Sequence, residues 1–212
     1  MTQTGKIDQL DLSLYSFLLP FASHRLDRAA RLWDRHHSLV LDLGCGNGDF
    51  LQHNRQKFDR ALGLDLAAPV SRQTTRIKFL RHDLNYTLPV KTRTVDLAVS
   101  ISTIEYLLDP YYFLREIRRV LKPGGELILH TLNLAFIKRR LELGLGRLPT
   151  FNKAPGWQSG IVHNFTWPTT EKLLTDQGFI ITARSCSGLY PHMRLWWPNL
   201  LAGDILLKAL KK

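Results

Sequence analysis

The chain has 212 residues, of which 44% are hydrophobic and 22% charged. This length favours one compact domain, and the composition excludes a disordered or fibrous chain. No apolar run reaches the roughly 20 residues that a membrane-spanning helix needs. The 29 Lys and Arg exceed the 18 Asp and Glu and give a formal charge of +11, which suits RNA, an anionic membrane or an anionic metabolite equally.

The longest apolar run covers residues 12–22, where Pro20 interrupts it and two aspartates precede it. A signal peptide would carry basic residues there, so we interpret the run as a packed segment. The two cysteines, Cys45 and Cys186, match no metal-ligand spacing. Such sparse cysteine usage is typical of a reducing compartment. We therefore predict a cytoplasmic protein with no metal site.

Short apolar runs alternate with amphipathic segments through the first two thirds of the chain. Ser23 is predicted to cap a first helix that ends near Arg35, within an N-terminal helical segment at residues 1–36. Strands are predicted at residues 39–43, 61–66, 77–80, 94–101 and 126–131, and helices from about residue 48 and at residues 109–121. This alternation is typical of a parallel sheet with helices on both faces. We predict an α/β fold with one doubly wound, Rossmann-like sheet in a domain at residues 37–212.

The C-terminal third has a different pattern. A helix opens at Trp167 and ends at Gly178, and residues 179–183 predict a strand. The tail at residues 202–210 fits a strand or a helix. Residues 144–160 are irregular, inside an insertion at residues 133–165, and long loops in compact domains are usually functional. We predict that this insertion is a substrate lid.

A glycine-rich turn, D-L-G-C-G-N-G at residues 42–48, follows the first apolar strand. Glycines let the backbone turn sharply and approach a ligand closely. In an open parallel sheet, ligands bind at the carboxyl ends of the strands, beside the N-terminus of the next helix. Asp65 ends the second strand, where it can accept from two ribose hydroxyls, and Asp83 follows the third, where it can accept from an adenine amino group.

These motifs resemble the class I S-adenosylmethionine-dependent methyltransferases over about residues 38–183. The V-D-L-A-V-S segment at residues 95–100 resembles the family's fourth-strand motif, and L-K-P-G-G at residues 121–125 resembles the segment before its fifth strand. The resemblance implies S-adenosylmethionine as cofactor and an antiparallel strand near the C-terminus. The cofactor-binding residues that it implies are Asp42, Gly44, Cys45, Gly46, Gly48, Asp65, Leu66, Asp83, Leu84 and Ser100.

Two features depart from the family's pattern. Residues 67–76 are too few for a helical crossover of ordinary length, and Tyr106 stands where many relatives have histidine. A dinucleotide dehydrogenase is the main rival, but it requires G-x-G-x-x-G, and its pyrophosphate would meet Asp42 unfavourably. The D-P-Y-Y segment that begins at Asp109 resembles a box of DNA amino-methylating enzymes, and a helix cap explains it fully.

Three residues are candidates for catalysis. His163 follows the predicted lid and ranks first as a general base, with a half-buried loop histidine as the alternative. Glu105 and Tyr106 rank next, with capping and core packing as alternatives. His82 and His130 are predicted to be structural, and residues 36–37 to be a surface histidine pair.

The basic and aromatic clusters are less specific. Four arginines at residues 25, 28, 31 and 35 share one helix face and predict a solvated surface. Lys138-Arg139-Arg140 is expected on a helix leading to the lid. Trp196 and Trp197, with Lys208, Lys211 and Lys212, suit a peripheral membrane contact, although packing beneath a C-terminal strand is the favoured alternative.

Taken together, the residues favour a methyltransferase acting on O, N or C of a small, anionic or lipid-linked metabolite. The alternatives are an RNA methyltransferase and a non-catalytic cofactor-binding scaffold. Residues 94–114, around the expected transfer site, hold three acidic and no basic residues, whereas residues 71–93, 115–140 and 184–212 hold most of the basic ones. The charge therefore favours an anion or surface at the rim and is poor support for nucleic acid.

Overall fold

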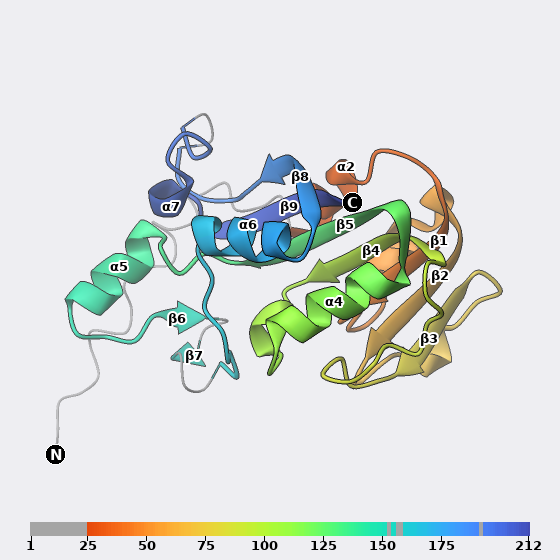
Figure 1. The fold of residues 1–212 in the computed structure, drawn as a ribbon. Helices are drawn as coiled ribbons and strands as arrows, with labels where there is room; N and C mark the ends of the chain where they lie inside the picture. Colours follow the sequence, from red (N-terminus) through yellow and green to blue (C-terminus); the bar gives the residue numbers. More distant parts are fainter. Residues whose placement is uncertain (1–24, 152–153, 156–158, 191–192) are drawn as a thin grey trace, which may run out of the picture.

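The computed structural model describes residues 25–151, 154–155, 159–190 and 193–212. Its centre is a seven-stranded sheet of order β3-β2-β1-β4-β5-β9-β8, and β6 and β7 form a separate two-stranded ladder (Figure 1). The strands are β1 (His37–Leu43), β2 (Phe58–Asp65), β3 (Ile77–Arg81), β4 (Val95–Ile101), β5 (Leu121–Leu132), β6 (Thr150–Phe151), β7 (Ala154–Pro155), β8 (Phe179–Ser185) and β9 (Asp204–Lys211).

Strands β1 to β5 are all parallel, and β9 pairs antiparallel with both β5 and β8. The predicted doubly wound, mostly parallel sheet with an antiparallel C-terminal strand is therefore confirmed. The tail is a strand, because each residue from Asp204 to Leu210 has a partner in β5. Burial on both faces explains its continuous apolar run, which periodicity alone could not assign.

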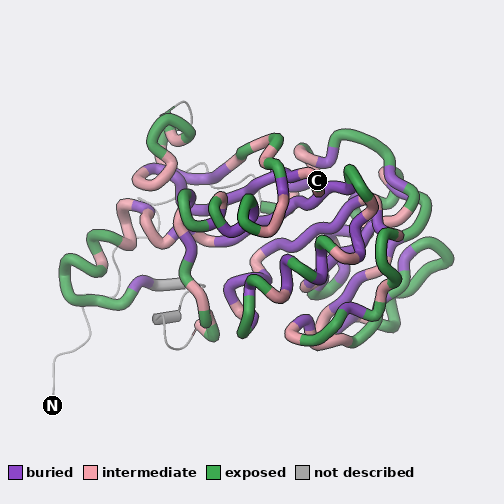
Figure 2. The backbone as a smooth tube through the Cα atoms, in the orientation of Figure 1, coloured by how far each residue is buried: buried purple, intermediate pink, exposed green. Residues whose placement is uncertain are grey.

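Helices cover both faces of the sheet. The helical segments are α2 (Arg25–Leu32), α3 (Asp49–His53), η1 (Arg55–Lys57), η2 (Val70–Arg72), η3 (Ile104–Tyr106), α4 (Pro110–Val120), α5 (Ile137–Gly144), α6 (Trp167–Asp176) and α7 (Pro198–Leu201). One apolar core lies between the sheet and α4 and α6, and a second between the sheet and α2 and α3. Figure 2 shows the central strands as the buried part of the molecule and the outer helix surfaces as exposed.

Local sequence explains the positions of several elements. Asp109 caps α4 by accepting from the backbone N–H of Tyr112, and Pro110 occupies the first helical turn, as predicted. Residues 66–76, all of them described, hold only the short turn η2 between β2 and β3, in line with the expected short crossover. The carboxyl ends of the parallel strands point to the side of the molecule where α5, β6 and β7 lie (Figure 1).

The first helix differs from the prediction. It ends at Leu32 rather than near Arg35, and its proposed cap Ser23 lies outside the described residues. Its arginine face is not uniformly solvated, because Arg28 is buried and forms an ion pair with Asp204 of β9. The correction follows from tertiary packing, since β9 places a carboxylate beneath this helix.

Two further surface predictions are wrong. His37 is buried beside Glu126, so only His36 of the expected surface pair is exposed. Trp196 and Trp197 do not pack beneath a strand, because they are 90% and 63% exposed. The lysine expected to accompany them, Lys208, is buried instead and contacts Asp34 and Glu126.

Among the described residues, no helix is long and apolar enough to cross a membrane. The same residues contain no cluster of His, Cys, Asp and Glu that could hold a metal ion.

Candidate active site

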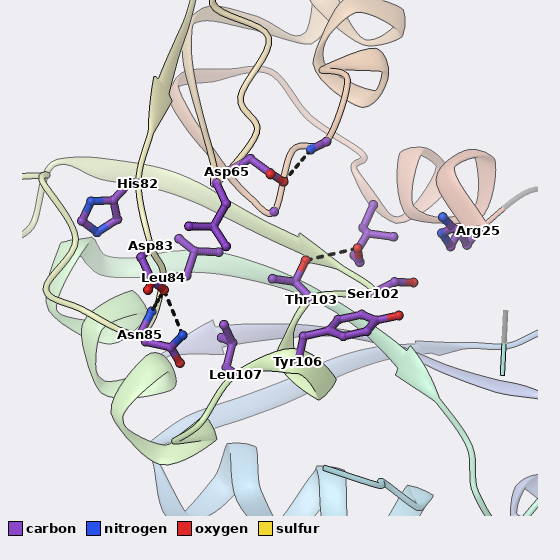
Figure 3. Close-up of a pocket in the computed structure, with 14 residues that line it drawn as sticks. Arg25, Asp65, His82, Asp83, Leu84, Asn85, Ser102, Thr103, Tyr106 and Leu107 are labelled. Atoms are coloured by element: carbon purple, nitrogen blue, oxygen red, sulfur yellow. Dashed lines mark hydrogen bonds between the residues drawn. The ribbon is translucent and has the colours of Figure 1, made fainter. Parts of the chain in front are cut away.

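A pocket of about 380 Å³ opens at the carboxyl ends of β1, β2, β3 and β4 (Figure 3). This is the edge of an open parallel sheet where ligands bind, and the volume is ordinary for a small-molecule site. The residues that line it are Arg25, Gly44, Gly46, Asp65, Leu66, His82, Asp83, Leu84, Asn85, Ile101, Ser102, Thr103, Tyr106 and Leu107.

The glycine-rich turn runs along one wall of this pocket. Gly44, Gly46 and Gly48 all have positive φ, at 82°, 51° and 75°. A Cβ on Gly44 would lie 2.0 Å from the hydroxyl oxygen of Thr103, and one on Gly48 would lie 2.4 Å from the ring of Phe79. At Gly46, no atom of the described chain lies within 4 Å of such a Cβ. The turn therefore needs glycine for its backbone and for close packing, and it leaves open space beside Gly46.

Asp65 fixes the turn to the end of β2. One carboxylate oxygen accepts from the backbone N–H of Gly46 at 2.9 Å, and the other accepts from Ala67 at 2.9 Å. Because each oxygen can accept a second hydrogen bond, Asp65 can still receive donors from a ligand in the pocket. Leu66 follows it, largely exposed, as an apolar lining residue.

The residues after β3 form one end of the pocket (Figure 3). Asp83 accepts from both the backbone and the side-chain amide of Asn85 through a single oxygen. Leu84, between these two residues in the sequence, supplies an apolar surface to the pocket. His82 also lines this end. A half-buried carboxylate next to an apolar surface suits a flat, amino-bearing ring.

Asp42 lies beneath the turn and borders a neighbouring hollow of about 230 Å³, which Cys45 and Arg25 also line. Its Oδ2 atom is buried and has no hydrogen-bond partner among the described residues. Burial, with the nearby charge of Asp65, raises the pKa of Asp42 to about 7. An orphaned buried carboxylate of this kind is completed by a cationic donor such as an ammonium group.

Other predicted cofactor residues are placed differently. Burial raises the pKa of the Cys45 thiol far above its usual value, so this cysteine is an apolar wall and not a nucleophile. Ser100 is fully buried within β4 and lines neither hollow, so its predicted contact with the cofactor is wrong. The serine that lines the pocket is Ser102, which lies just beyond the end of β4.

Of the three predicted catalytic residues, only Tyr106 lines the described pocket. Tyr106 lines the pocket, and Gly160, at the end of the predicted lid, lies against its ring. Glu105 is buried behind the wall, where burial raises its pKa and Thr131 donates to its Oε2 atom. The imidazole of His163 contacts the carbonyl of Leu108 at 3.1 Å, outside the pocket lining.

Sequence reasoning missed several lining residues, among them Arg25, Ser102 and Thr103. Their signals differ. Ser102 and Thr103 directly follow the fourth strand, so their place at a strand end could have marked them. Arg25 comes from α2, and no local pattern indicates that this helix crosses the mouth of the pocket.

Comparison with known proteins finds a methyltransferase domain in part of the chain. Residues 41–129 match the family model described as a methyltransferase domain, and this range holds the glycine turn and all three carboxylates. Over these residues the chain matches the methyltransferase-domain family, and the motifs there resemble those of the class I S-adenosylmethionine-dependent methyltransferases. The family's cofactor, S-adenosylmethionine, fits the site on its own chemistry, because the orphaned Asp42 oxygen suits its ammonium group and Asp65 suits its ribose.

The relatives of this chain are partial matches. A malonyl-[acyl-carrier protein] O-methyltransferase of Hamiltonella defensa is 34% identical over 109 residues, which are 50% of this chain and 42% of the relative. A ubiquinone biosynthesis O-methyltransferase of Xanthomonas oryzae is 30% identical over 118 residues, which are 51% of this chain and 49% of the relative. The chain thus spans less than half the length of these curated relatives.

The fold of this chain is also that of a solved structure. An S-adenosylmethionine-dependent methyltransferase from Mesorhizobium loti superposes with a TM-score of 0.68 at 22% identity, covering 89% of this chain and 99% of that one. This likeness extends the common architecture beyond residues 41–129 to the C-terminal strands.

Proposed function

We propose that the protein transfers the methyl group of S-adenosylmethionine to an O, N or C atom of a small, anionic or lipid-linked metabolite. The observation that carries the proposal is the pocket in Figure 3, which joins the ends of four strands and continues past the cofactor side to Tyr106 and Arg25. The named O-methyltransferase activities of two partial relatives support it.

Each end of the pocket has its own task in this proposal. Asp83 and Leu84 would hold the adenine, Asp65 the ribose, and Asp42 with the glycine turn the amino acid part. When bound, S-adenosylmethionine supplies a methyl group on a positively charged sulfur. The chain contributes alignment and exclusion of water, which account for much of the rate in such displacements.

The substrate side is formed by Tyr106, Leu107, Ser102 and Arg25. The guanidinium of Arg25 gives this side a positive charge, so an anionic acceptor is favoured there. Tyr106 would contact the acceptor directly. Glu105 and His163, which lie behind it, would hold the wall in place, since the backbone N–H groups of Val162 and His163 both donate to the carbonyl of Glu105.

Incubation with methyl-labelled S-adenosylmethionine and a fractionated mixture of small metabolites or RNA tests this function. We expect label in the small-molecule fraction, and we expect Tyr106→Ala to reduce it strongly while Tyr86→Ala, an exposed tyrosine outside the pocket, does not. Label only in RNA would show the RNA methyltransferase alternative. Cofactor binding without transfer to either fraction would show the scaffold alternative.

We also propose a peripheral membrane contact through the segment that holds Trp196 and Trp197. Met193 and Leu195 are exposed beside them, and exposed apolar patches of this kind mark interaction sites. Flotation with anionic vesicles tests this contact. Binding that survives the double change Trp196→Ala and Trp197→Ala would contradict it.

A further inference from the structure

Ser102 connects the pocket to a buried chain of polar groups. Its hydroxyl oxygen lies 3.0 Å from Nδ1 of His130, and Nε2 of His130 lies 3.3 Å from Oδ2 of Asp204. Ser102 lines the pocket, whereas His130 and Asp204 are 1% and 6% exposed. The chain therefore runs from the substrate side of the pocket into the core.

The three residues are held on rigid neighbouring elements. Ser102 directly follows β4 with a positive φ of 55°, an uncommon conformation for a residue with a side chain. His130 lies in β5 opposite Ile101 of β4 and Leu206 of β9. Adjacent strands in the middle of a sheet fix side chains more accurately than loops do, so this geometry is preformed.

The hydrogen bonds of Asp204 set the tautomer of His130. The carboxylate also accepts from Arg28 and from the backbone and hydroxyl of Ser187. Burial alone would raise the pKa of Asp204, but its interactions with His130, Arg28 and Ser187 lower that pKa by more. The resulting pKa lies well below the usual range of an aspartate. An ionised carboxylate only accepts, so Nε2 of His130 carries the proton and Nδ1 is left to accept from Ser102.

The arrangement has the parts of a proton relay. In serine hydrolases a serine hydroxyl, a histidine and a buried aspartate move a proton in this way, and the aspartate orients the imidazole and stabilises its charged form. Here the hydroxyl faces a pocket that also holds Tyr106 and Arg25 (Figure 3). A serine that only capped the end of β4 would not require a buried histidine–aspartate pair behind it.

We propose that Ser102, His130 and Asp204 form a proton relay that serves a hydroxyl-bearing methyl acceptor. This inference rests on the proposed function. Ser102 is the catalytic residue because it faces the acceptor, and His130 and Asp204 act through it.

The step balances in atoms and charge. The acceptor oxygen forms a bond to the methyl carbon as the bond between that carbon and sulfur breaks, and the electron pair stays on sulfur. The acceptor proton passes to Oγ of Ser102, and the proton of Ser102 passes to Nδ1 of His130. The products are a methyl ether, a neutral thioether and an imidazolium that returns its proton to water after product release.

The relay restricts the class of acceptor. A carboxylate has no proton to lose at neutral pH, so its methylation would make no use of these groups. A hydroxyl must lose one proton, and a positioned base typically contributes about 100-fold or more to such a step. The structure thus favours a hydroxyl over a carboxylate.

The charges around His130 come from three packed elements. Asp204 of β9 and Glu105 of η3 place negative charge near His130, and Arg28 of α2 places positive charge beside Asp204. Arg139 adds a more distant positive charge near Asp204. A proton on Nδ1 would remove the acceptor that Ser102 needs, so the relay works only with a neutral imidazole.

Nitrogen NMR of histidine-labelled protein tests the relay without turnover. We expect His130 to carry its proton on Nε2 at neutral pH, and Ser102→Ala to shift the Nδ1 resonance far more than the Nε2 resonance. Ser38→Ala, an exposed serine at the opposite end of the sheet, is the control. A proton on Nδ1, or no response to Ser102→Ala, would overturn the relay.

Turnover with dihydroxybenzoate, which carries hydroxyls and a carboxylate on one anionic ring, tests the acceptor class. We expect an alkali-stable methyl ether, about 100-fold lower kcat in Ser102→Ala and His130→Gln, and unchanged KM for S-adenosylmethionine. The wild-type rate should fall on acidification, whereas the residual rates of both variants should not. His36→Gln, an exposed histidine, should behave as wild type.

The outcomes separate the two proposals. An alkali-labile methyl ester, no ether product, or variants that keep the wild-type pH profile would overturn the relay, while binding of S-adenosylmethionine would still support the proposed function. A protein that does not bind S-adenosylmethionine would overturn the proposed function, and the NMR result would then decide the relay geometry by itself.

Discussion

Asp42 is the residue whose burial is hardest to explain without a ligand. Its pKa of about 7 lies above its ordinary value of 3.8, because burial and the charge of Asp65 penalise its ionised form. Between those pH values the folded protein holds a proton that the unfolded chain has released. The free energy of unfolding should therefore fall as pH rises through this window and level off above about pH 7.

Asp42→Asn tests this penalty. The decline in the free energy of unfolding between about pH 5 and about pH 8 should be smaller in the variant than in the wild type, by on the order of 2 kcal/mol. Urea unfolding at the two pH values measures it. Asp59→Asn, an exposed aspartate, is the control. Equal declines in wild type and Asp42→Asn would contradict the raised pKa.

The glycines of the turn are not equivalent. Gly44→Ala places a Cβ against Thr103 and requires a left-handed backbone, whereas Gly46→Ala meets only the backbone cost of about 1–2 kcal/mol. Urea unfolding should therefore show a larger loss of stability for Gly44→Ala, by about 2 kcal/mol or more. Similar losses for the two variants would show that Thr103 moves aside freely.

At the scale of elements, a buried ion pair between Arg28 and Asp204 holds α2 against the sheet. The sequence pattern of the helix gives no sign of this pair. Arg28→Ala leaves Asp204 buried with one partner fewer and should cost about 3–5 kcal/mol of unfolding free energy. Arg31→Ala, on an exposed part of the same helix, should change it by no more than about 0.5 kcal/mol. Chemical denaturation of both variants measures the two losses of unfolding free energy. Equal losses would contradict a stabilising role for the ion pair between Arg28 and Asp204.

The elements were predictable where the local pattern agrees with the environment. Strand-length apolar runs and the cap at Asp109 gave β1 to β5 and α4, because strands covered on both faces need continuous apolar runs. The tail remained ambiguous because its partners are distant in sequence. The buried state of Arg28 and His37 was missed for the same reason, since their acidic partners come from β9 and β5.

At the scale of the whole molecule, the site was partly predictable. Carboxylates at strand ends were found from their position after apolar runs, and Asp65 and Asp83 indeed line one pocket. Ser100 was assigned to the cofactor because it belongs to the motif of the fourth strand, but it is buried within β4, and Ser102, just beyond the strand, lines the pocket instead. The link from Ser102 to Asp204 joins residues about a hundred positions apart and leaves no local signal.

The excess of basic residues acquires a clearer meaning in three dimensions. Several of these residues are used internally, as with Arg28 and Lys208, which pair with buried carboxylates. The pocket itself is bordered by Asp65 and Asp83, with Arg25 at its substrate side. Among the described residues that line this pocket, two are acidic and one is basic, which agrees with a small-molecule acceptor.

The central claim is that S-adenosylmethionine binds through the strand-end carboxylates, and calorimetric titration with Asp65→Ala tests it most directly. We expect the wild type to bind and the variant to lose about 1–3 kcal/mol of binding free energy, because ribose hydroxyls lose an acceptor. Asp59→Ala, an exposed aspartate remote from the pocket, should bind as wild type. Unchanged affinity in a folded Asp65→Ala protein would contradict the account.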